Sequence, residues 1–101
     1  MNVLIVDDDA MVADLNRCYI ERVDGFVCCG IASTLQQAKE KVQDATLSID
    51  LILLDVYMQQ DNGLDLLPIV RDSGRAIDVI MISSASDAAT VQTSLRYGVV
   101  D

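Results

Sequence analysis

The sequence predicts a single α/β domain, built on an open, doubly wound parallel sheet with helices on both faces. Three observations indicate this fold. Short, almost wholly apolar runs alternate four times with segments of helical periodicity, the connections between them are short, and two of the runs end directly in aspartate. Consecutive apolar residues are typical of strands buried on both faces, and this alternation requires right-handed crossovers between parallel strands.

The first predicted strand covers residues 3–6 (VLIV), and a helix follows it. Apolar residues recur at spacings of three and four as far as Arg22, which is typical of an amphipathic helix. Asp9 is well placed to cap its first turn. We expect Met11 to fill part of the core, as methionines commonly do.

Gly25 breaks the chain before a second predicted strand over residues 26–31. Ser33 and Thr34 are each followed three residues later by a glutamine, so each offers a capping box for the next helix. That helix is expected to turn three apolar side chains inward: Leu35, Ala38 and Val42.

The third predicted strand, residues 51–54 (LILL), runs straight into Asp55, and a polar loop follows. Gly63 then precedes a helix that we expect to begin near Leu64. Pro68 is tolerable early in this helix, where backbone amides have no acceptors within the helix. The side chains expected to point inward are Leu64, Leu67 and Val70.

The fourth predicted strand covers residues 79–82 and ends at Ser83. Asp87 is expected to cap a last helix, and Gly98 is a suitable residue to close it. Beyond Gly98 the chain begins an element that we expect to continue past Asp101.

Composition limits the function. The 101 residues suit one domain, and 51% of them are hydrophobic, which is ample for a core. Seven basic and sixteen acidic residues give a net charge of −9, so the domain is a poor binder of nucleic acid or anionic membrane by itself. No apolar run approaches the roughly 18 residues of a membrane helix, and no secretory signal is visible. We therefore expect a cytoplasmic protein with no membrane partner.

The chain contains no histidine, which excludes histidine metal sites, serine–histidine hydrolysis and phosphotransfer through histidine. Its three cysteines, Cys18, Cys28 and Cys29, show no metal-binding spacing. We expect them to be small buried hydrophobic residues in a reducing compartment.

The carboxylates at two strand ends form the candidate site. If the first and third strands are neighbours, then Asp7, Asp8 and Asp55 converge at one edge of the sheet. Two carboxylates about 4 Å apart repel by roughly 4 kcal/mol at an effective dielectric constant near 20, so the cluster suggests a bound cation. An all-oxygen ligand set suits Mg²⁺ or Mn²⁺. A carboxylate beside such an ion can act as a nucleophile toward a phosphoryl group and form an acyl phosphate.

Ser83 follows the fourth strand as Asp55 follows the third, so its hydroxyl is expected at the same edge, where it can donate to a phosphoryl oxygen. A cation for the remaining phosphoryl oxygens is not evident, because no lysine or arginine occupies a strand end. We expect that residue at the end of a fifth strand beyond Asp101.

Together, residues 3–9 (VLIVDDD), Asp55 with Met58 and Gly63, and residues 82–85 (ISSA) resemble a two-component response-regulator receiver domain. The resemblance extends over the whole chain, residues 1–101. It implies a flavodoxin-like sheet with strand order 2-1-3-4, lacking the fifth strand and fifth helix. It also implies a signalling domain, not an enzyme, apart from slow self-dephosphorylation.

The resemblance also implies roles for individual residues. Asp55 matches the phosphoacceptor, and Asp7 and Asp8 match the acidic pair that binds Mg²⁺ together with Asp55. The backbone carbonyl of Tyr57 matches a further metal ligand. Ser83 matches the residue that contacts the phosphoryl group and moves in the activation switch. The side chains at two further positions match those that tune dephosphorylation, Tyr57 and Ala85.

Four segments show a narrower likeness, to regulators of citrate and C4-dicarboxylate (fumarate, succinate) metabolism: residues 2–16, 28–34, 50–68 and 83–101. That subfamily implies a membrane sensor histidine kinase as phosphate donor. It also implies a C-terminal helix-turn-helix domain through which the protein contacts DNA.

Two departures from the family are present. Gln59 stands where many receivers have proline, which we expect to be harmless. The sequence also stops at Asp101, before the fifth strand, its lysine, the aromatic switch residue and the fifth helix. We expect this to expose core residues of the first and third strands and to leave the fourth strand as an edge. A polypeptide of only these residues would then be marginally stable, or would form a homodimer or exchange elements.

Two other interpretations remain open. A haloacid-dehalogenase-type phosphatase would use Asp7 as nucleophile and Asp9 as acid/base, with Ser83 at a later strand end. Against it, Ala10 and Met11 replace the usual small turn residues, no suitable lysine follows, and such enzymes are much longer. The other is a receiver-like interaction domain that works without phosphorylation, which predicts no Mg²⁺ binding at millimolar concentration.

Overall fold

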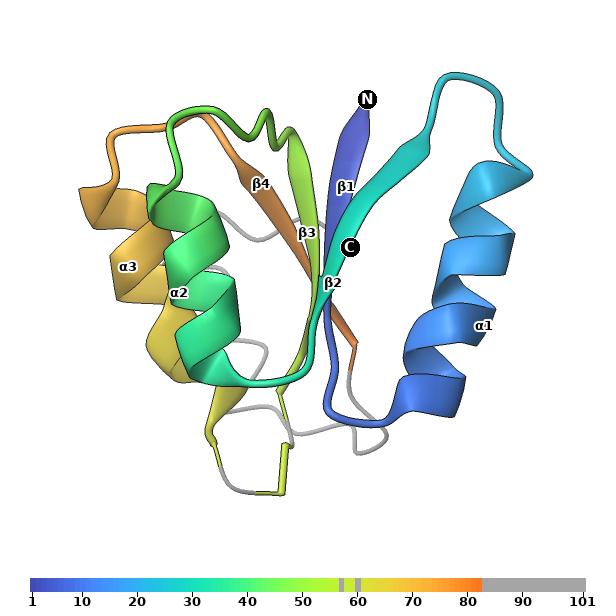
Figure 1. Ribbon diagram of the computed structural model, residues 1–101. Helices are drawn as coiled ribbons and strands as arrows, with labels where there is room; N and C mark the ends of the chain where they lie inside the picture. Colours follow the sequence, from blue (N-terminus) through green and yellow to red (C-terminus); the bar gives the residue numbers. More distant parts are fainter. Residues whose placement is uncertain (57, 60, 83–101) are drawn as a thin grey trace.

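The computed structural model describes residues 1–56, 58–59 and 61–82. The strands of this part are β1 (Asn2–Val6), β2 (Val27–Ala32), β3 (Leu51–Asp55) and β4 (Asp78–Ile82), and the helices are α1 (Ala10–Glu21), α2 (Leu35–Gln43), the 3₁₀ turn η1 (Gly63–Asp65) and α3 (Leu66–Asp72). The strands are parallel in the order β2-β1-β3-β4, with α1 on one face and α2 and α3 on the other (Figure 1). The predicted α/β fold and strand order are confirmed.

The element boundaries agree with the sequence predictions to within one or two residues, except before α3. The single helix expected near Leu64 is instead the turn η1 followed by α3. Pro68 lies in the first turn of α3, where its missing amide costs no hydrogen bond. The predicted strand end at Ser83 and the helix from Asp87 to Gly98 lie outside the described residues.

The register brings the carboxyl ends of the strands together. Val6 of β1 pairs with Leu54 of β3, and Asp55 pairs with Ile82 of β4. Asp7, the residue after Val6, therefore lies beside the end of β3. This edge is at the lower end of the sheet in Figure 1.

Local capping fixes where the helices begin. The Asp9 side chain accepts hydrogen bonds from the first-turn amides of Met11 and Val12, as predicted. In α2, Thr34 accepts from the amide of Gln37, but the side chain of Gln37 accepts from Ser33 instead of returning to Thr34. The reciprocal capping boxes expected at Ser33 and Thr34 are thus replaced by one arrangement that spans both residues.

The main core lies between the sheet and the α2/α3 layer. The predicted inward residues Ala38, Val42, Leu67 and Val70 are buried there, while Leu35 and Leu64 are half-buried against the core. The buried members of this core are Leu4, Val6, Ala32, Ala38, Val42, Ile49, Ile52, Leu54, Met58, Leu66, Leu67, Val70 and Val79.

The α1 face differs from what the sequence predicts. Within α1, which the structure describes in full, only Ala13 is buried, and Met11 is 83% exposed. The expectation that Met11 fills the core is wrong. A small residue lets the helix lie close to the sheet, and the apolar arc with Met11 and Leu15 is turned outward. The expected exposure of strand residues is also wrong for β1, whose Val3 and Ile5 are buried.

The cysteines are only partly as expected. Cys18 is exposed on α1, which contradicts the prediction of burial, and Cys28 and Cys29 are half-buried in β2. Burial raises the pKa of the Cys29 thiol, with a further rise from neighbouring Cys28.

None of the helices in the described part of the chain is long and apolar enough to cross a membrane.

Candidate functional site at the carboxyl edge of the sheet

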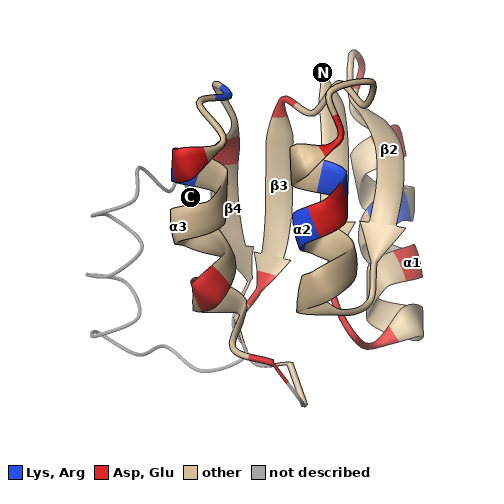
Figure 2. Ribbon diagram, turned by 60° about the vertical axis from the view of Figure 1, so that its left-hand side comes forward, with Lys and Arg blue, Asp and Glu red and all other residues tan. Residues whose placement is uncertain are grey.

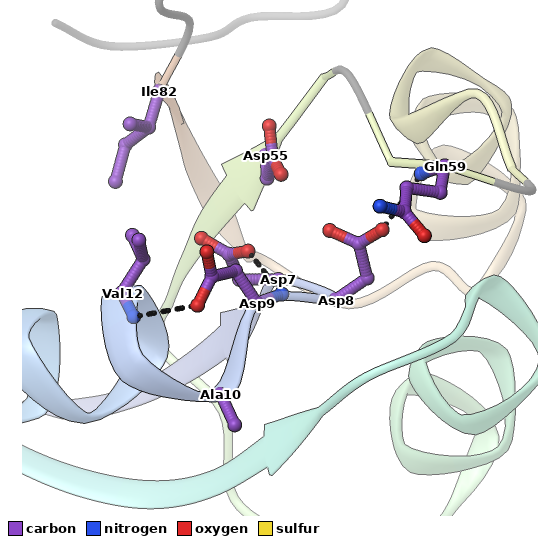
Figure 3. A pocket seen from close by; sticks show the side chains of 8 residues that line it. All are labelled: Asp7, Asp8, Asp9, Ala10, Val12, Asp55, Gln59 and Ile82. Atoms are coloured by element: carbon purple, nitrogen blue, oxygen red, sulfur yellow. Dashed lines mark hydrogen bonds between the residues drawn. The ribbon is translucent and has the colours of Figure 1, made fainter.

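Three carboxylates converge where β1 and β3 end. One oxygen from each of Asp7, Asp8 and Asp55 lies within 4.8 Å of the other two. They line a cavity of about 580 Å³, which Figure 3 shows from close by. Among the described residues, those that line it are Asp7, Asp8, Asp9, Ala10, Val12, Asp55, Gln59 and Ile82. The convergence predicted from two strand ends far apart in the sequence is therefore present.

Asp7 is the most deeply placed of the three, with only 4% of its surface exposed. Its carboxylate accepts a hydrogen bond of 2.9 Å from the amide of Asp9. Burial raises the pKa of Asp7, the Asp9 amide opposes this, and the negative charges of Asp55 and Asp8 raise it further. Among the described residues that line the cavity, no lysine or arginine offsets this rise in the pKa of Asp7.

Asp8 connects the site to the loop after β3. Its Oδ2 accepts a hydrogen bond of 2.7 Å from the backbone amide of Gln59, drawn as a dashed line in Figure 3. The same loop closes at Gly63, whose amide donates to the carbonyl of Val56 at 3.0 Å. A Cβ atom at Gly63 would overlap the backbone carbonyl of Asp55, so a side chain is excluded there.

A fourth carboxylate that lines the cavity, Asp9, caps α1. Asp9 accepts from the amides of Met11 and Val12 and so belongs to the start of α1. Its carboxylate is held toward the helix and not toward Asp55, as Figure 3 shows. Two further predicted site residues, Ser83 and Tyr57, lie outside the described residues.

The donor set fits a hard divalent cation. It consists of carboxylate oxygens from Asp7, Asp8 and Asp55, close enough to share one ion. Figure 2 shows acidic and no basic segments at this lower edge of the described structure, so the three carboxylates lie in a locally negative environment. A divalent cation offsets that negative charge, and the three carboxylates are suited to hold Mg²⁺ or Mn²⁺.

Two features of the site were not found from the sequence. The Gln59 amide that binds Asp8 is a backbone group, so residue 59 carries no sign of it. The close approach of Gly63 to Asp55 could have been suspected, because a glycine soon after a functional loop often marks a place where backbone segments meet.

The fold and this acidic edge define a class of signalling domain. Residues 3–101 match the model of the response regulator receiver domain, and the chain belongs to that family. The match covers almost the whole chain, so the predicted family is confirmed.

Particular relatives narrow this class. The chain is 61% identical over 101 residues to the transcriptional regulatory protein DcuR of Escherichia coli (strain K12), and 37% identical over 101 residues to the probable C4-dicarboxylate response regulator DctR of Halalkalibacterium halodurans. Both alignments cover all of this chain but only 42% and 43% of the relatives.

A solved structure agrees. The response regulator domain of Thermotoga maritima CheB superposes with a TM-score of 0.85 at 30% identity, covering 100% of this chain and 75% of that domain's chain. This protein is therefore a receiver domain of a two-component response regulator related to DcuR.

Proposed function

We propose that Asp55 is the phosphoacceptor of this domain. The observation that carries the proposal is the convergence of Asp55 with Asp7 and Asp8 at the carboxyl edge. Asp55 is half-buried at the end of β3 and opens onto the cavity, so an incoming phosphoryl group can reach it. Asp7 is buried and Asp9 caps α1, which makes both poorer nucleophiles.

In the proposed reaction an oxygen of Asp55 bonds to phosphorus while the bond from phosphorus to the donor breaks, which yields an acyl phosphate. Asp7, Asp8 and Asp55 would hold Mg²⁺, and family resemblance adds the backbone carbonyl of Tyr57. When bound, the ion supplies positive charge against the phosphoryl oxygens. Resemblance also assigns to Ser83 the contact with the phosphoryl group and a part in the switch.

The donor we propose is a sensor histidine kinase, which the receiver family implies as partner. Relatives named as a transcriptional regulator and as a probable C4-dicarboxylate response regulator favour an output in transcription. We therefore propose that residues 1–101 act as the receiver of a cytoplasmic regulator of C4-dicarboxylate or citrate metabolism, with DNA contacted by a module outside these residues. The net charge of −9 supports a DNA-binding module outside these residues, because so acidic a domain binds nucleic acid poorly by itself.

We also propose that a polypeptide of residues 1–101 alone self-associates or exchanges elements. The apolar residues that α1 turns outward, including Met11, Leu15 and Tyr19, support this proposal. Sedimentation analysis should find dimers. A monomer that melts cooperatively above about 50 °C, within the range of ordinary stable domains, would contradict it.

Phosphate uptake from acetyl phosphate tests the phosphoacceptor. With Mg²⁺ present, the wild-type protein should gain one phosphate by intact mass, and the Asp55→Asn variant should gain none. Asp7→Asn should label slowly, because it loses a metal ligand and not the nucleophile. Labelling that persists in Asp55→Asn and disappears in Asp7→Asn would instead support the phosphatase-type scheme.

Calorimetry distinguishes this proposal from the alternative of an interaction domain that works without phosphorylation. Our proposal predicts Mg²⁺ binding at millimolar concentration that Asp7→Asn weakens. If the wild-type protein shows neither heat of binding nor phosphate uptake, the acidic pocket is not a phosphorylation site.

A further inference from the structure

The loop after β3 reaches across to α2. The Oδ2 atom of Asp61 accepts a hydrogen bond of 3.0 Å from the backbone amide of Leu35, 26 residues away in the sequence. Leu35 is the first residue of α2, and amides of a first helical turn have no acceptor within the helix. Thr34 takes the amide of Gln37, so Asp61 serves a different amide from outside the helix.

The placement of another carboxylate here has a cost. The carboxyl edge already carries Asp7, Asp8 and Asp55, and no lysine or arginine lines the adjoining cavities in the described structure. The amide of Leu35 and the positive end of the α2 dipole offset that repulsion at Asp61. The carboxylate is therefore favoured at one place, against the start of α2.

The same loop is held at a second point by the acidic site. The amide of Gln59 donates to Asp8 at 2.7 Å, two residues before Asp61. Between the two attachments lies a cavity of about 170 Å³ lined by Asp8, Ser33, Thr34, Met58, Gln59 and Asp61. Met58, the residue before Gln59, is buried in the core, which holds this end of the loop against the sheet.

We propose that Asp61 is a positioning residue for the phosphoacceptor site. By fastening the loop to α2, it keeps the amide of Gln59 against Asp8 and so fixes the orientation of the Asp8 carboxylate. Asp61 acts through Gln59 and Asp8, and it lies outside the three-carboxylate cluster. The significance of the Asp8 orientation rests on the proposed function, whereas the coupling between the two attachments does not.

Three variants test this inference. Asp61→Ala removes the acceptor, Asp61→Asn keeps an acceptor oxygen without the charge, and Thr34→Ala removes the other first-turn acceptor of α2 as a matched control. The measurements are amide hydrogen exchange of Leu35 and Gln59 by NMR, the affinity for Mg²⁺ by calorimetry, and the rate of phosphate uptake from acetyl phosphate.

In Asp61→Ala, both the Leu35 and the Gln59 amides should exchange about tenfold faster, although only Leu35 loses its direct partner. Affinity for Mg²⁺ should fall about three- to tenfold, and phosphate uptake should slow in step. Asp61→Asn should stay within about twofold of the wild type in all three measurements, because its amide oxygen still accepts. Thr34→Ala should speed exchange at Gln37 and leave Gln59 and Mg²⁺ affinity unchanged.

Faster exchange at Leu35 alone in Asp61→Ala, with Gln59 exchange and Mg²⁺ affinity as in the wild type, would reduce Asp61 to a helix cap and overturn the inference. Thr34→Ala behaving like Asp61→Ala would do the same, because loosening α2 by any route would then suffice. If Asp61→Ala does not fold, Asp61→Asn with Gln59 exchange more than about tenfold faster than wild type would contradict a role for the acceptor oxygen. A wild-type protein that binds no Mg²⁺ refutes the proposed function, while the Gln59 exchange still decides the coupling.

Discussion

The two faces of the sheet differ in their packing and in their polar contacts. The α2/α3 face has a dense core and is fastened by polar contacts between distant segments. The guanidinium of Arg75 donates to the carbonyls of Val42 at 2.9 Å, Asp44 at 3.3 Å and Leu47, while Asp61 holds the opposite end of α2. An arginine at the helix C-terminus and an aspartate at its N-terminus both complement the helix dipole.

Among the described residues, the α1 face has fewer polar contacts between distant segments. Within the described residues its ion pairs are internal to the helix, from Arg17 to Asp14 at 2.7 Å and to Glu21 at 3.2 Å. The amide nitrogen of Asn16 is buried without a hydrogen-bond partner in the described structure. The contrast shows that the α2/α3 face holds the large apolar core and the loop of the acidic site, whereas within α1 only Ala13 is buried and Asp9 caps the first turn.

The strongest test of this contrast is Gly63→Ala, where the site loop meets β3. A Cβ there would overlap the backbone of Asp55, so the substitution should cost about 4 kcal/mol and abolish Mg²⁺ binding. Gly25→Ala is the control, because nothing lies near its Cβ and only its φ of +87° is strained, at about 1 kcal/mol. Urea denaturation measures both, and equal losses would refute the close-approach argument.

Truncation of one leucine on each face compares the two layers directly. Leu67→Ala, at a side chain that is 1% exposed, should destabilise the fold by about 3 kcal/mol through lost burial and a cavity. Leu15→Ala, at a side chain that is 53% exposed, should change stability by no more than about 0.5 kcal/mol. Similar losses in thermal or urea unfolding would mean that α1 packs as firmly as α3.

Loss of a polar contact should also cost more stability on the α2/α3 face than on the α1 face. Arg75→Ala leaves three carbonyls without their donor and should cost about 2 kcal/mol. Arg17→Ala removes two exposed ion pairs and should cost less than about 1 kcal/mol, decreasing further in salt. Denaturation at low and high ionic strength checks both, and a salt-sensitive loss at Arg75 would contradict its assignment as a carbonyl cap.

At the carboxyl edge of the sheet, Asp7→Asn should change the free energy of unfolding by a smaller amount that depends on pH. The pKa of Asp7 is raised in the folded state, chiefly by burial, so the folded protein binds the proton more tightly than the unfolded chain. The free energy of unfolding therefore falls as pH rises from the ordinary aspartate value through the raised one. Without divalent ions, Asp7→Asn should lack this fall and be more stable than wild type at neutral pH.

Addition of Mg²⁺ should narrow or reverse that difference, because an ion that binds the folded state stabilises the wild type more than Asp7→Asn. Urea titrations across the pH range, with and without Mg²⁺, provide the comparison. A wild-type protein that gains stability over Asp7→Asn as pH rises without metal would show that the sign is wrong.

Most of the fold and the carboxylate part of the site could be predicted from the sequence. Apolar strands ending at Asp7 and Asp55 leave a direct pattern, and the cap at Asp9 is a local effect. The burial of α1 differs from the prediction, because periodicity predicts an apolar arc but not that Ala13, a small residue, faces the sheet. The contact from Gln59 to Asp8 spans 51 residues and uses a backbone amide, which leaves no trace in residue types.

The identity of the residue that receives the phosphoryl group, which we propose is Asp55 at the end of β3, can be tested chemically. The most direct measurement is reductive trapping: the protein is incubated with acetyl phosphate and Mg²⁺, treated with borohydride, and digested for peptide mass spectrometry. Reduction converts an aspartyl phosphate to homoserine. We expect homoserine at position 55, dependent on Mg²⁺, with Asp7, Asp8 and Asp9 intact. Homoserine at position 7 with Asp55 unchanged would contradict it.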